Sequence, residues 1–276
     1  MANTIDWGQA AVNNTNGFGK SATNNTIDFG EICADSWSPE TNLVGGGAVF
    51  SNTQSILTDG VDDFVNMGNV LNMADDGTDA FTFSFWCKGI SGTYIRQYFG
   101  KMTSTIHGYG MYRVGNVIYL FLGDYSSACI MARYTFSDST DGNWHHFAWT
   151  YDGSEDVSGF TLYIDNTPVT LLTQFNNAPI TNVVTTANFT IGSRNTLYEM
   201  NANFDEFAYF NSELSQSDVT SIYGGGVPSS LSSYSSLVSW WRCGDNDTSP
   251  TLTDNGSGGN DGTMTNFSTF STDVPT

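Results

Sequence analysis

Residues 81–86 read Phe-Thr-Phe-Ser-Phe-Trp, and this alternation of rings with small polar side chains decides the fold class. Because successive side chains of a β-strand point to opposite faces, the three phenylalanines share one face and predict a strand that packs on an aromatic core. Other strand-like runs lie at 116–122, 146–151, 160–165 and 188–192, and Asp-Gly turn signals stand at 59–60, 76–77, 141–142 and 152–153. Short strands with frequent turns predict an all-β, antiparallel sandwich or barrel.

The remaining segments frame this region. Residues 46–227 form the expected sandwich, with a single short helix over 213–223 that Ser212 or Ser215 would cap and the glycines at 224–226 would end. Residues 228–276 are rich in Ser, Thr, Gly and Asn, but they include Leu237-Val238-Ser239-Trp240-Trp241-Arg242. Two exposed indoles would make an adhesive patch, so we expect this strand to be buried in the sandwich.

Residues 1–45 form an extended N-terminal repeat segment. An Asn-Thr pair, an aromatic residue and a glycine recur every 11 residues, with the aromatic at Trp7, Phe18 and Phe29. A fixed spacing indicates a repeated structural unit, and so short a segment cannot bury three rings on its own. We therefore expect the rings to anchor the chain on a partner subunit or another protein; the alternative is that they pack on the following domain.

Composition excludes several classes of protein. The chain has 276 residues, 39% hydrophobic and 14% aromatic, which is enough for a large core and unlike a disordered chain. Eight Lys and Arg against 28 Asp and Glu give a net charge of −20, which repels nucleic acid and attracts cations. No stretch is long and apolar enough to insert in a membrane, and no export signal is visible. The four cysteines (33, 87, 129 and 243) are far apart, so we expect free buried thiols and no zinc site.

Five motifs, in order, resemble the laminin-G-like, concanavalin-A-like jelly rolls. They cover about residues 48–225, and the family sequences that they resemble are DGVDDYV, FTISFW, DGxWHH, GxxLYIDG and xIDEVxIYNRALS. Here these motifs stand at 59–65, 81–86, 141–146, 159–165 and 204–215, with Asn166 in place of the glycine. The resemblance implies an antiparallel jelly-roll β-sandwich.

The C-terminal segment departs from that family. Its Leu237–Arg242 strand and the Gly258-Gly259-Asn260-Asp261-Gly262-Thr263 run resemble a motif that the family often places first. We infer that this segment closes the sheet of the same chain, as in a circular permutation, or else is lent to a neighbouring subunit. The N-terminal repeats and Trp37–Gly45 resemble the starts of bacteriophage virion proteins, especially tail or head-fibre proteins.

Enzymatic chemistry is not expected. A glycan hydrolase of this fold needs two carboxylates on one sheet face, about two positions apart on a strand. None of the six glutamates has an acid two positions later, and the adjacent Asp205 and Glu206 would point to opposite faces of a strand. His145 and His146 are expected to be structural, one packed inward and the other facing solvent, with no nucleophile suggested beside them.

Two binding sites are candidates. Asp59, Asp62, Asp63 and Asp205 are hard oxygen ligands, and relatives in the resembled family bind Ca²⁺ near such loops; the alternative is that these carboxylates cap turns. Arg194, Asn195 and Tyr198 supply the stacking and hydrogen-bonding groups that a sugar needs, and the stretch from Tyr94 to Tyr98 offers similar groups. Either stretch could equally be a solvated loop or a subunit contact.

Together these features suggest a non-enzymatic phage protein on the virion surface, assembled in the host cytoplasm and oligomeric. Its N-terminal repeats would contact other virion proteins, and its sandwich would bind host-surface glycans, with Ca²⁺ as a structural ion. A decoration protein that binds no sugar and, less favoured, a secreted glycan hydrolase are the alternatives.

Overall fold

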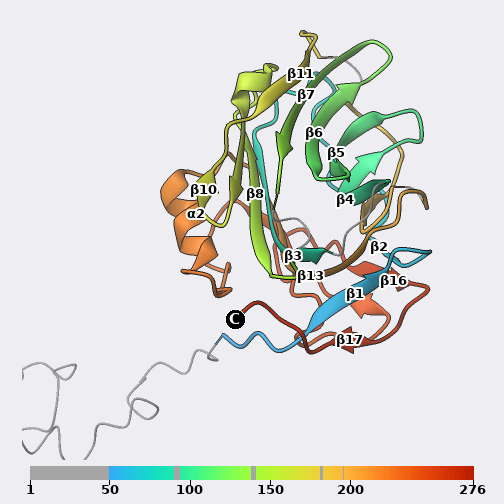
Figure 1. Ribbon diagram of the computed structural model, residues 1–276, viewed down its shortest axis with the longest axis vertical. Coiled ribbons are helices and arrows are strands. Elements are labelled where there is room, and N and C mark those ends of the chain that lie inside the picture. The colour runs from blue at the N-terminus through green and yellow to red at the C-terminus, as the bar shows by residue number, and fades with distance from the viewer. Residues whose placement is uncertain (1–49, 90–93, 138–140, 181–182, 195) are drawn as a thin grey trace, which may run out of the picture. The chain divides into compact units, whose positions relative to one another are not determined.

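The computed structural model describes residues 50–276 apart from 90–93, 138–140, 181–182 and 195. Two antiparallel sheets pack face to face and form a sandwich (Figure 1). The anchoring residues proposed at Trp7, Phe18 and Phe29 lie outside the described residues. Within the described residues, no helix is long and apolar enough to cross a membrane.

The first sheet has the order β10-β9-β8-β3-β13-β1-β17, and β14 also pairs with β13. β13 is long enough to pair with β1 along its first half and with β14 along its second half. The strands of this sheet are β1 (Ser55–Asp59), β3 (Phe81–Gly89), β8 (His145–Tyr151), β9 (Phe160–Ile164), β10 (Thr167–Pro168), β13 (Asn201–Phe210), β14 (Leu237–Trp241) and β17 (Phe270–Ser271).

The second sheet has the order β11-β7-β6-β5-β4-β12-β2-β16-β15, and its central strands curve over the first sheet (Figure 1). Its strands are β2 (Phe64–Asn66), β4 (Ile95–Met102), β5 (His107–Val114), β6 (Val117–Asp124), β7 (Ala128–Thr135), β11 (Leu172–Asn176), β12 (Phe189–Ile191), β15 (Thr251–Leu252) and β16 (Gly262–Thr265). The all-β sandwich prediction is confirmed.

An aromatic core fills the space between the sheets, as the Phe81–Trp86 pattern predicts. Phe81, Phe83 and Phe85 all point inward and are fully buried. The Phe83 ring centroid lies 4.5 Å from that of Phe99 in the opposite sheet, and the Phe85 centroid lies 5.1 Å from that of Phe207. Such tilted and offset pairs add to the free energy of burying the rings.

The C-terminal segment contributes to both sheets of its own chain. β14 pairs with β13 and β17 with β1 in the first sheet, while β16 pairs with β2 in the second. Trp241 is fully buried, and its ring lies 6.0 Å from those of Phe189 and Phe207. The strand-like Leu237–Arg242 run is therefore part of the sandwich rather than of a loose tail.

The α-helix α2 (Gln216–Tyr223) lies beside β10 on the outside of the first sheet (Figure 1). Ser215 caps it: the Ser215 hydroxyl accepts a bond from the Asp218 amide, and the Asp218 carboxylate accepts one from the Ser215 amide. Gly224 ends the helix in the left-handed conformation, at φ 59°. The helix thus starts three residues later than Glu213. The 3-10 turn η3 (Val157–Gly159) precedes β9.

Candidate functional site

The two stretches that the sequence proposes for sugar binding lie side by side. The Gln97 amide, near the start of β4, donates a hydrogen bond of 2.9 Å to the carbonyl oxygen of Tyr198, in the connection between β12 and β13. Tyr94 is 72% exposed and Leu197 is 44% exposed, while Arg96 and Tyr198 are half-buried. We call these four side chains the Tyr94 surface.

Arg194 supports this surface from below. Only 3% of Arg194 is exposed, and its guanidinium lies 4.2 Å from the centroid of the Tyr198 ring. Its Nη1 also contacts the Met102 sulfur at 3.7 Å. Burial lowers the pKa of Arg194. As placed, Arg194 orients Tyr198 by a cation–π contact and does not face solvent itself. Asn195 lies outside the described residues.

Three residues close in sequence to the Tyr94 surface have buried polar atoms without a hydrogen-bond partner. Gln97 Oε1, Ser193 Oγ and Arg194 Nε make no hydrogen bond to any described residue. Buried polar groups are nearly always paired, because an unpaired one loses its water without compensation. Each of these atoms therefore has unused hydrogen-bonding capacity.

Three of the four proposed calcium ligands form a cluster. Asp59, Asp62 and Asp63 each place one carboxylate oxygen within 4.8 Å of the others. The alternative role is also visible, since Asp59 Oδ1 accepts the Val61 amide at 2.8 Å and Asp63 Oδ2 accepts the Asp59 amide at 3.1 Å. Burial, together with the charges of Asp59 and Asp62, raises the pKa of Asp63, so the cluster carries a repulsion that a cation would relieve.

Asp205, the fourth proposed ligand, is not part of that cluster, and it does not point away from Glu206. A β-bulge shifts the β13–β3 register between Asp205 and Ala208, and Glu206 has a φ of 47°. The extra residue turns both carboxylates to the outer face of the first sheet. There Asp205 accepts a 2.9 Å bond from Asn52 Nδ2, and Glu206 accepts one from Trp240 Nε1. The prediction of opposite faces is therefore wrong.

Burial dominates the electrostatics of this carboxylate cluster. Asp205 is fully buried, Glu206 is 4% exposed and Asp245 is 7% exposed, with Arg242 as the basic partner of the last two. Burial raises the pKa of Glu206 to about 7, although Arg242 and Trp240 act in the other direction. Burial and the neighbouring Glu206 charge raise the pKa of Asp205 well above its usual range. These acids are sealed from solvent, so the arrangement gives them no access to a substrate.

His146 of the His145–His146 pair is buried, whereas His145 is half-buried, with 13% of its side chain exposed. His146 is fully buried on the outer face of the first sheet, and its ring lies 5.9 Å from Tyr223 of α2. Its Nε2 is 2.9 Å from the Ser84 hydroxyl, a contact that the sequence did not suggest. Because Ser84 is only 1% exposed, this pair is a buried hydrogen bond. Burial lowers the pKa of His146 to about 4.

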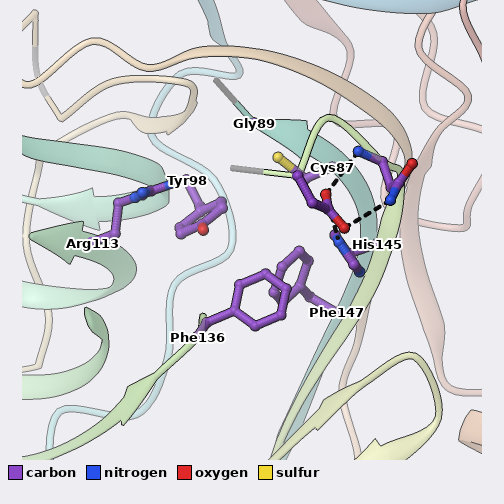
Figure 2. Close-up of a pocket in the computed structure, with 9 residues that line it drawn as sticks. Cys87, Gly89, Tyr98, Arg113, Phe136, His145 and Phe147 are labelled. Carbon is purple, nitrogen blue, oxygen red and sulfur yellow. Dashed lines mark hydrogen bonds and ion pairs between the residues drawn. The ribbon is translucent and has the colours of Figure 1, made fainter. Parts of the chain in front are cut away.

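His145 closes a small cavity at the start of β8 (Figure 2). Its Nδ1 lies 2.7 Å from Asp165 Oδ2, and its Nε2 lies 3.3 Å from Asp141 Oδ1. Burial opposes the charged ring, but the bonds to Asp165 and Asp141 outweigh it and raise the pKa of His145. The cavity holds about 10 Å³ between Tyr98, Phe147 and His145, which is room for about one water molecule. It is too small for a sugar.

One solved structure with a TM-score above 0.5 supports the fold, and two others show partial similarity. A proposed carbohydrate binding protein from Bacteroides ovatus is 12% identical, with a TM-score of 0.56 over 82% of this chain and 62% of that one. The binding domain of botulinum neurotoxin DC, solved with SialylT, is 15% identical, with a TM-score of 0.41 over 53% and 35%. The binding domain of Paraclostridial mosquitocidal protein 1 is also 15% identical, with a TM-score of 0.44 over 63% and 46%. The chain covers less than two thirds of each of these structures.

No curated protein matches the sequence. Residues 59–220 match the sequence profile of the concanavalin A-like lectin/glucanases superfamily. This region holds all five motifs whole, and it spans more than half of the chain. The chain therefore belongs to the concanavalin A-like lectin/glucanases superfamily.

Proposed function

We propose that the chain is a non-catalytic glycan-binding protein on the surface of a bacteriophage particle. The convergence of the Tyr94 and Tyr198 connections carries the glycan-binding part of this proposal. An exposed tyrosine offers a face on which a sugar ring can stack, and Arg96, whose guanidinium carbon lies 6.0 Å from the Tyr94 centroid, can donate to sugar hydroxyls.

The particle context rests on the sequence. The 11-residue repeats place aromatic residues at Trp7, Phe18 and Phe29, and they resemble the starts of virion proteins. In the proposed arrangement these repeats contact other virion proteins, the protein is a homo-oligomer, and the sandwich projects to the host surface. Several copies would raise the avidity of a weak sugar site without any new contact.

The burial of Asp205 and Glu206 supports a binding role over hydrolysis. A retaining or inverting glycosidase needs two carboxylates that reach the same glycosidic bond. Here both carboxylates lie beneath the segment 50–54 and β14, and each accepts hydrogen bonds from neighbouring side chains. We therefore propose that the acids stabilise the sheet and take no part in catalysis.

Calcium enters the proposal as a structural ion at Asp59, Asp62 and Asp63. Their oxygens are of the type that Ca²⁺ prefers, and the net charge of −20 favours cation binding. Addition of CaCl₂ should raise the unfolding midpoint, and Asp62→Asn should remove that rise. An equal rise in Asp62→Asn and in Asp261→Asn, an aspartate outside the cluster, would show that Ca²⁺ only screens surface charge.

The function is tested by binding the full chain to a panel of bacterial lipopolysaccharides and capsular polysaccharides, with CaCl₂ and again with EDTA. We expect saturable binding to at least one polysaccharide, and Tyr94→Ser should weaken it. Tyr125→Ser is the matched control, because Tyr125 is also exposed, at 51%, but contacts Phe175 edge-on and is not one of the four side chains of the Tyr94 surface.

The outcomes separate the alternatives. Binding that is lost in EDTA supports a calcium-dependent lectin. Binding that persists in EDTA means that Ca²⁺ affects only the stability of the fold. If the folded protein binds no polysaccharide under either condition, the glycan proposal fails and a structural decoration protein remains.

A further inference from the structure

A second concave site lies away from the Tyr94 surface, where β13 ends and β3 begins. It is a cleft of about 550 Å³, within the size range of small-molecule binding sites. One wall is the connection between β2 and β3, and the other is the C-terminal segment around Val238 and Gly258. Leu71, Ala80 and Val238 give the cleft an apolar part. Its polar residues are Asn72, Thr78, Asp79, Tyr209, Asn211 and Asn260.

Tyr209 is the most informative of these polar residues. Its side chain is packed into the core, with 6% of the residue exposed and its ring 4.9 Å from Phe83. The hydroxyl makes no hydrogen bond to any described residue, although buried tyrosines usually find a partner. Burial and the nearby Asp79 raise the pKa of Tyr209 to about 12, so the hydroxyl is a proton donor at neutral pH. The Tyr209 hydroxyl is therefore a hydrogen-bond donor, fixed in position by the packing of its ring, that lines the cleft.

Acceptors are held in the same cleft. Asn260 is fixed by three hydrogen bonds of 2.8 Å. Its backbone N–H donates to the Asp254 carboxylate, its side-chain Nδ2 donates to the Ser239 hydroxyl, and its backbone carbonyl accepts from the Trp241 indole N–H. These bonds leave Asn260 Oδ1 for a ligand. Asp79 uses Oδ2 to accept the Ala74 amide at 2.6 Å, which leaves Oδ1. A site whose groups are already held in place loses little entropy when a ligand binds.

The charge of the lining residues selects the class of ligand. Asp79 is the only charged side chain among them, so the cleft offers no cation to an anionic group. Hydroxyl groups fit this set, because they can donate to Asp79 and Asn260 and can accept from Tyr209 and from the amide groups of Asn72 and Asn211. The apolar part suits the C–H face of a sugar ring.

We propose that this cleft binds one residue of a neutral saccharide, as a site separate from the Tyr94 surface. The C-terminal segment supplies Val238, Gly258 and Asn260, so the site exists only when that segment has closed the sandwich. This inference does not depend on polysaccharide binding at Tyr94.

The test is saturation-transfer NMR on the full chain with methyl glycosides of glucose, galactose, mannose and N-acetylglucosamine. Methyl glucuronide is the matched anionic probe for methyl glucoside, because a carboxylate replaces one hydroxymethyl group. We expect at least one neutral glycoside to bind in preference to the glucuronide. Tyr209→Phe and Asp79→Asn should each weaken that binding about tenfold, the size of one lost hydrogen bond to a held partner.

Two controls make the result specific. Tyr223→Phe removes the hydroxyl of a tyrosine whose ring also stacks, on Trp86 at 5.7 Å, but which does not line the cleft. Tyr223→Phe should leave glycoside affinity unchanged, and Tyr94→Ser shows what share of glycoside binding belongs to the Tyr94 surface. Asp79 is exposed, so Asp79→Asn keeps a folded variant available if Tyr209→Phe is unstable.

Three results would overturn the proposal. They are no binding of any neutral glycoside to the folded chain, equal affinity for the glucuronide, and unchanged affinity in Tyr209→Phe and Asp79→Asn. If Tyr94→Ser loses polysaccharide binding but keeps glycoside binding, the cleft is a binding site separate from the Tyr94 surface.

Discussion

Glu206 has a left-handed backbone conformation and shares a buried cluster with Asp205, Asp245 and Arg242. Because three carboxylates share one guanidinium, protonation of a carboxylate is favoured. Burial raises the pKa of Glu206 to about 7 from a usual value of 4.5. A carboxyl whose pKa is raised by folding stabilises the protein most below the unfolded pKa. That contribution is lost as pH rises through the folded pKa.

We predict that Glu206→Gln removes part of the pH dependence of stability between about pH 4.5 and 7. The free energy of unfolding of the wild type should fall by roughly 3 kcal/mol across that window as Glu206 ionises. The neutral amide of Glu206→Gln does not titrate, so the variant lacks this fall. Burial of His146 acts in the opposite direction, because its pKa is lowered to about 4. The quantity to measure is therefore the difference in free energy of unfolding between variant and wild type at each pH, by urea denaturation.

Glu213→Gln is the control for this series, since Glu213 is exposed outside the cluster. If the Glu206→Gln difference does not change with pH, or if Glu213→Gln reproduces it, burial does not control the protonation of Glu206.

Gly142 and Gly153 test backbone conformation apart from crowding. Both follow an aspartate and have similar φ values, 79° and 81°. A Cβ at Gly142 meets no atom within 4 Å, whereas a Cβ at Gly153 lies 2.3 Å from the Thr78 carbonyl oxygen. Gly142→Ala should cost about 1–2 kcal/mol from the left-handed conformation alone. Gly153→Ala should cost clearly more, as measured by urea denaturation, and equal losses would contradict the crowding argument.

At the scale of elements, the alternation of aromatic and polar residues predicted the strands, and the capping residues predicted the helix. Phe81–Trp86 and Phe160–Asp165 fall on β3 and β9, and the Ser215 cap and Gly224 stop define α2. The bulge at Glu206 was missed because its only sequence signal is one extra residue between Phe204 and Phe207, which both face the core. Register across strands decides such a feature, and the sequence of one strand does not contain it.

The candidate sites were predictable to different degrees. Asp59, Asp62 and Asp63 are near in sequence, so their clustering follows from one tight turn. Arg194 could not be distinguished from an exposed ligand group, because its burial depends on Met102 and Tyr198. The cleft at Tyr209 gave no sequence signal, because its walls come from segments that are almost 190 residues apart.

β14 carries the next prediction. Trp241→Ala should destabilise the protein by about 3–5 kcal/mol, because its ring fills the core between Phe189 and Phe207. Thermal or urea unfolding measures this loss. Leu172→Ala is the control, because Leu172 is 56% exposed on the edge strand β11 and should change stability by less than about 0.5 kcal/mol. A small loss in Trp241→Ala would mean that the C-terminal segment is not needed to close the core.

For the whole molecule, the positions of the basic residues bear on the charge of the surface. Of the eight Lys and Arg, Lys101, Arg113, Arg194 and Arg242 are each at least 92% buried. Lys101, for example, donates to the Ala187 carbonyl at 2.7 Å and also to Asn69. Five acids are buried as well (Asp63, Asp205, Glu206, Asp245 and Asp254), so the surface keeps the strong acidic excess of the composition, and its acids repel one another.

We predict that NaCl stabilises the protein at low ionic strength. Raising the salt from about 10 mM to 150 mM shortens the screening length from about 30 Å to about 8 Å, which weakens repulsion across the surface. The unfolding midpoint should rise over this range, as followed by circular dichroism. A midpoint that falls would mean that surface ion pairs such as Lys88–Asp273, at 2.6 Å, outweigh the repulsion.

The pairing of β1 with both β13 and β17 also has a mechanical consequence. The segment just before β1 is tied to the sheet by Asn52–Asp205 and by Thr53–Asp245, and β1 itself is bonded along both edges. A pull applied at Phe50 along the axis of β1 loads these bonds in shear, so they must yield together rather than one after another. We therefore expect the β1 end of the sandwich to resist such a pull better than a strand that is bonded along one edge only.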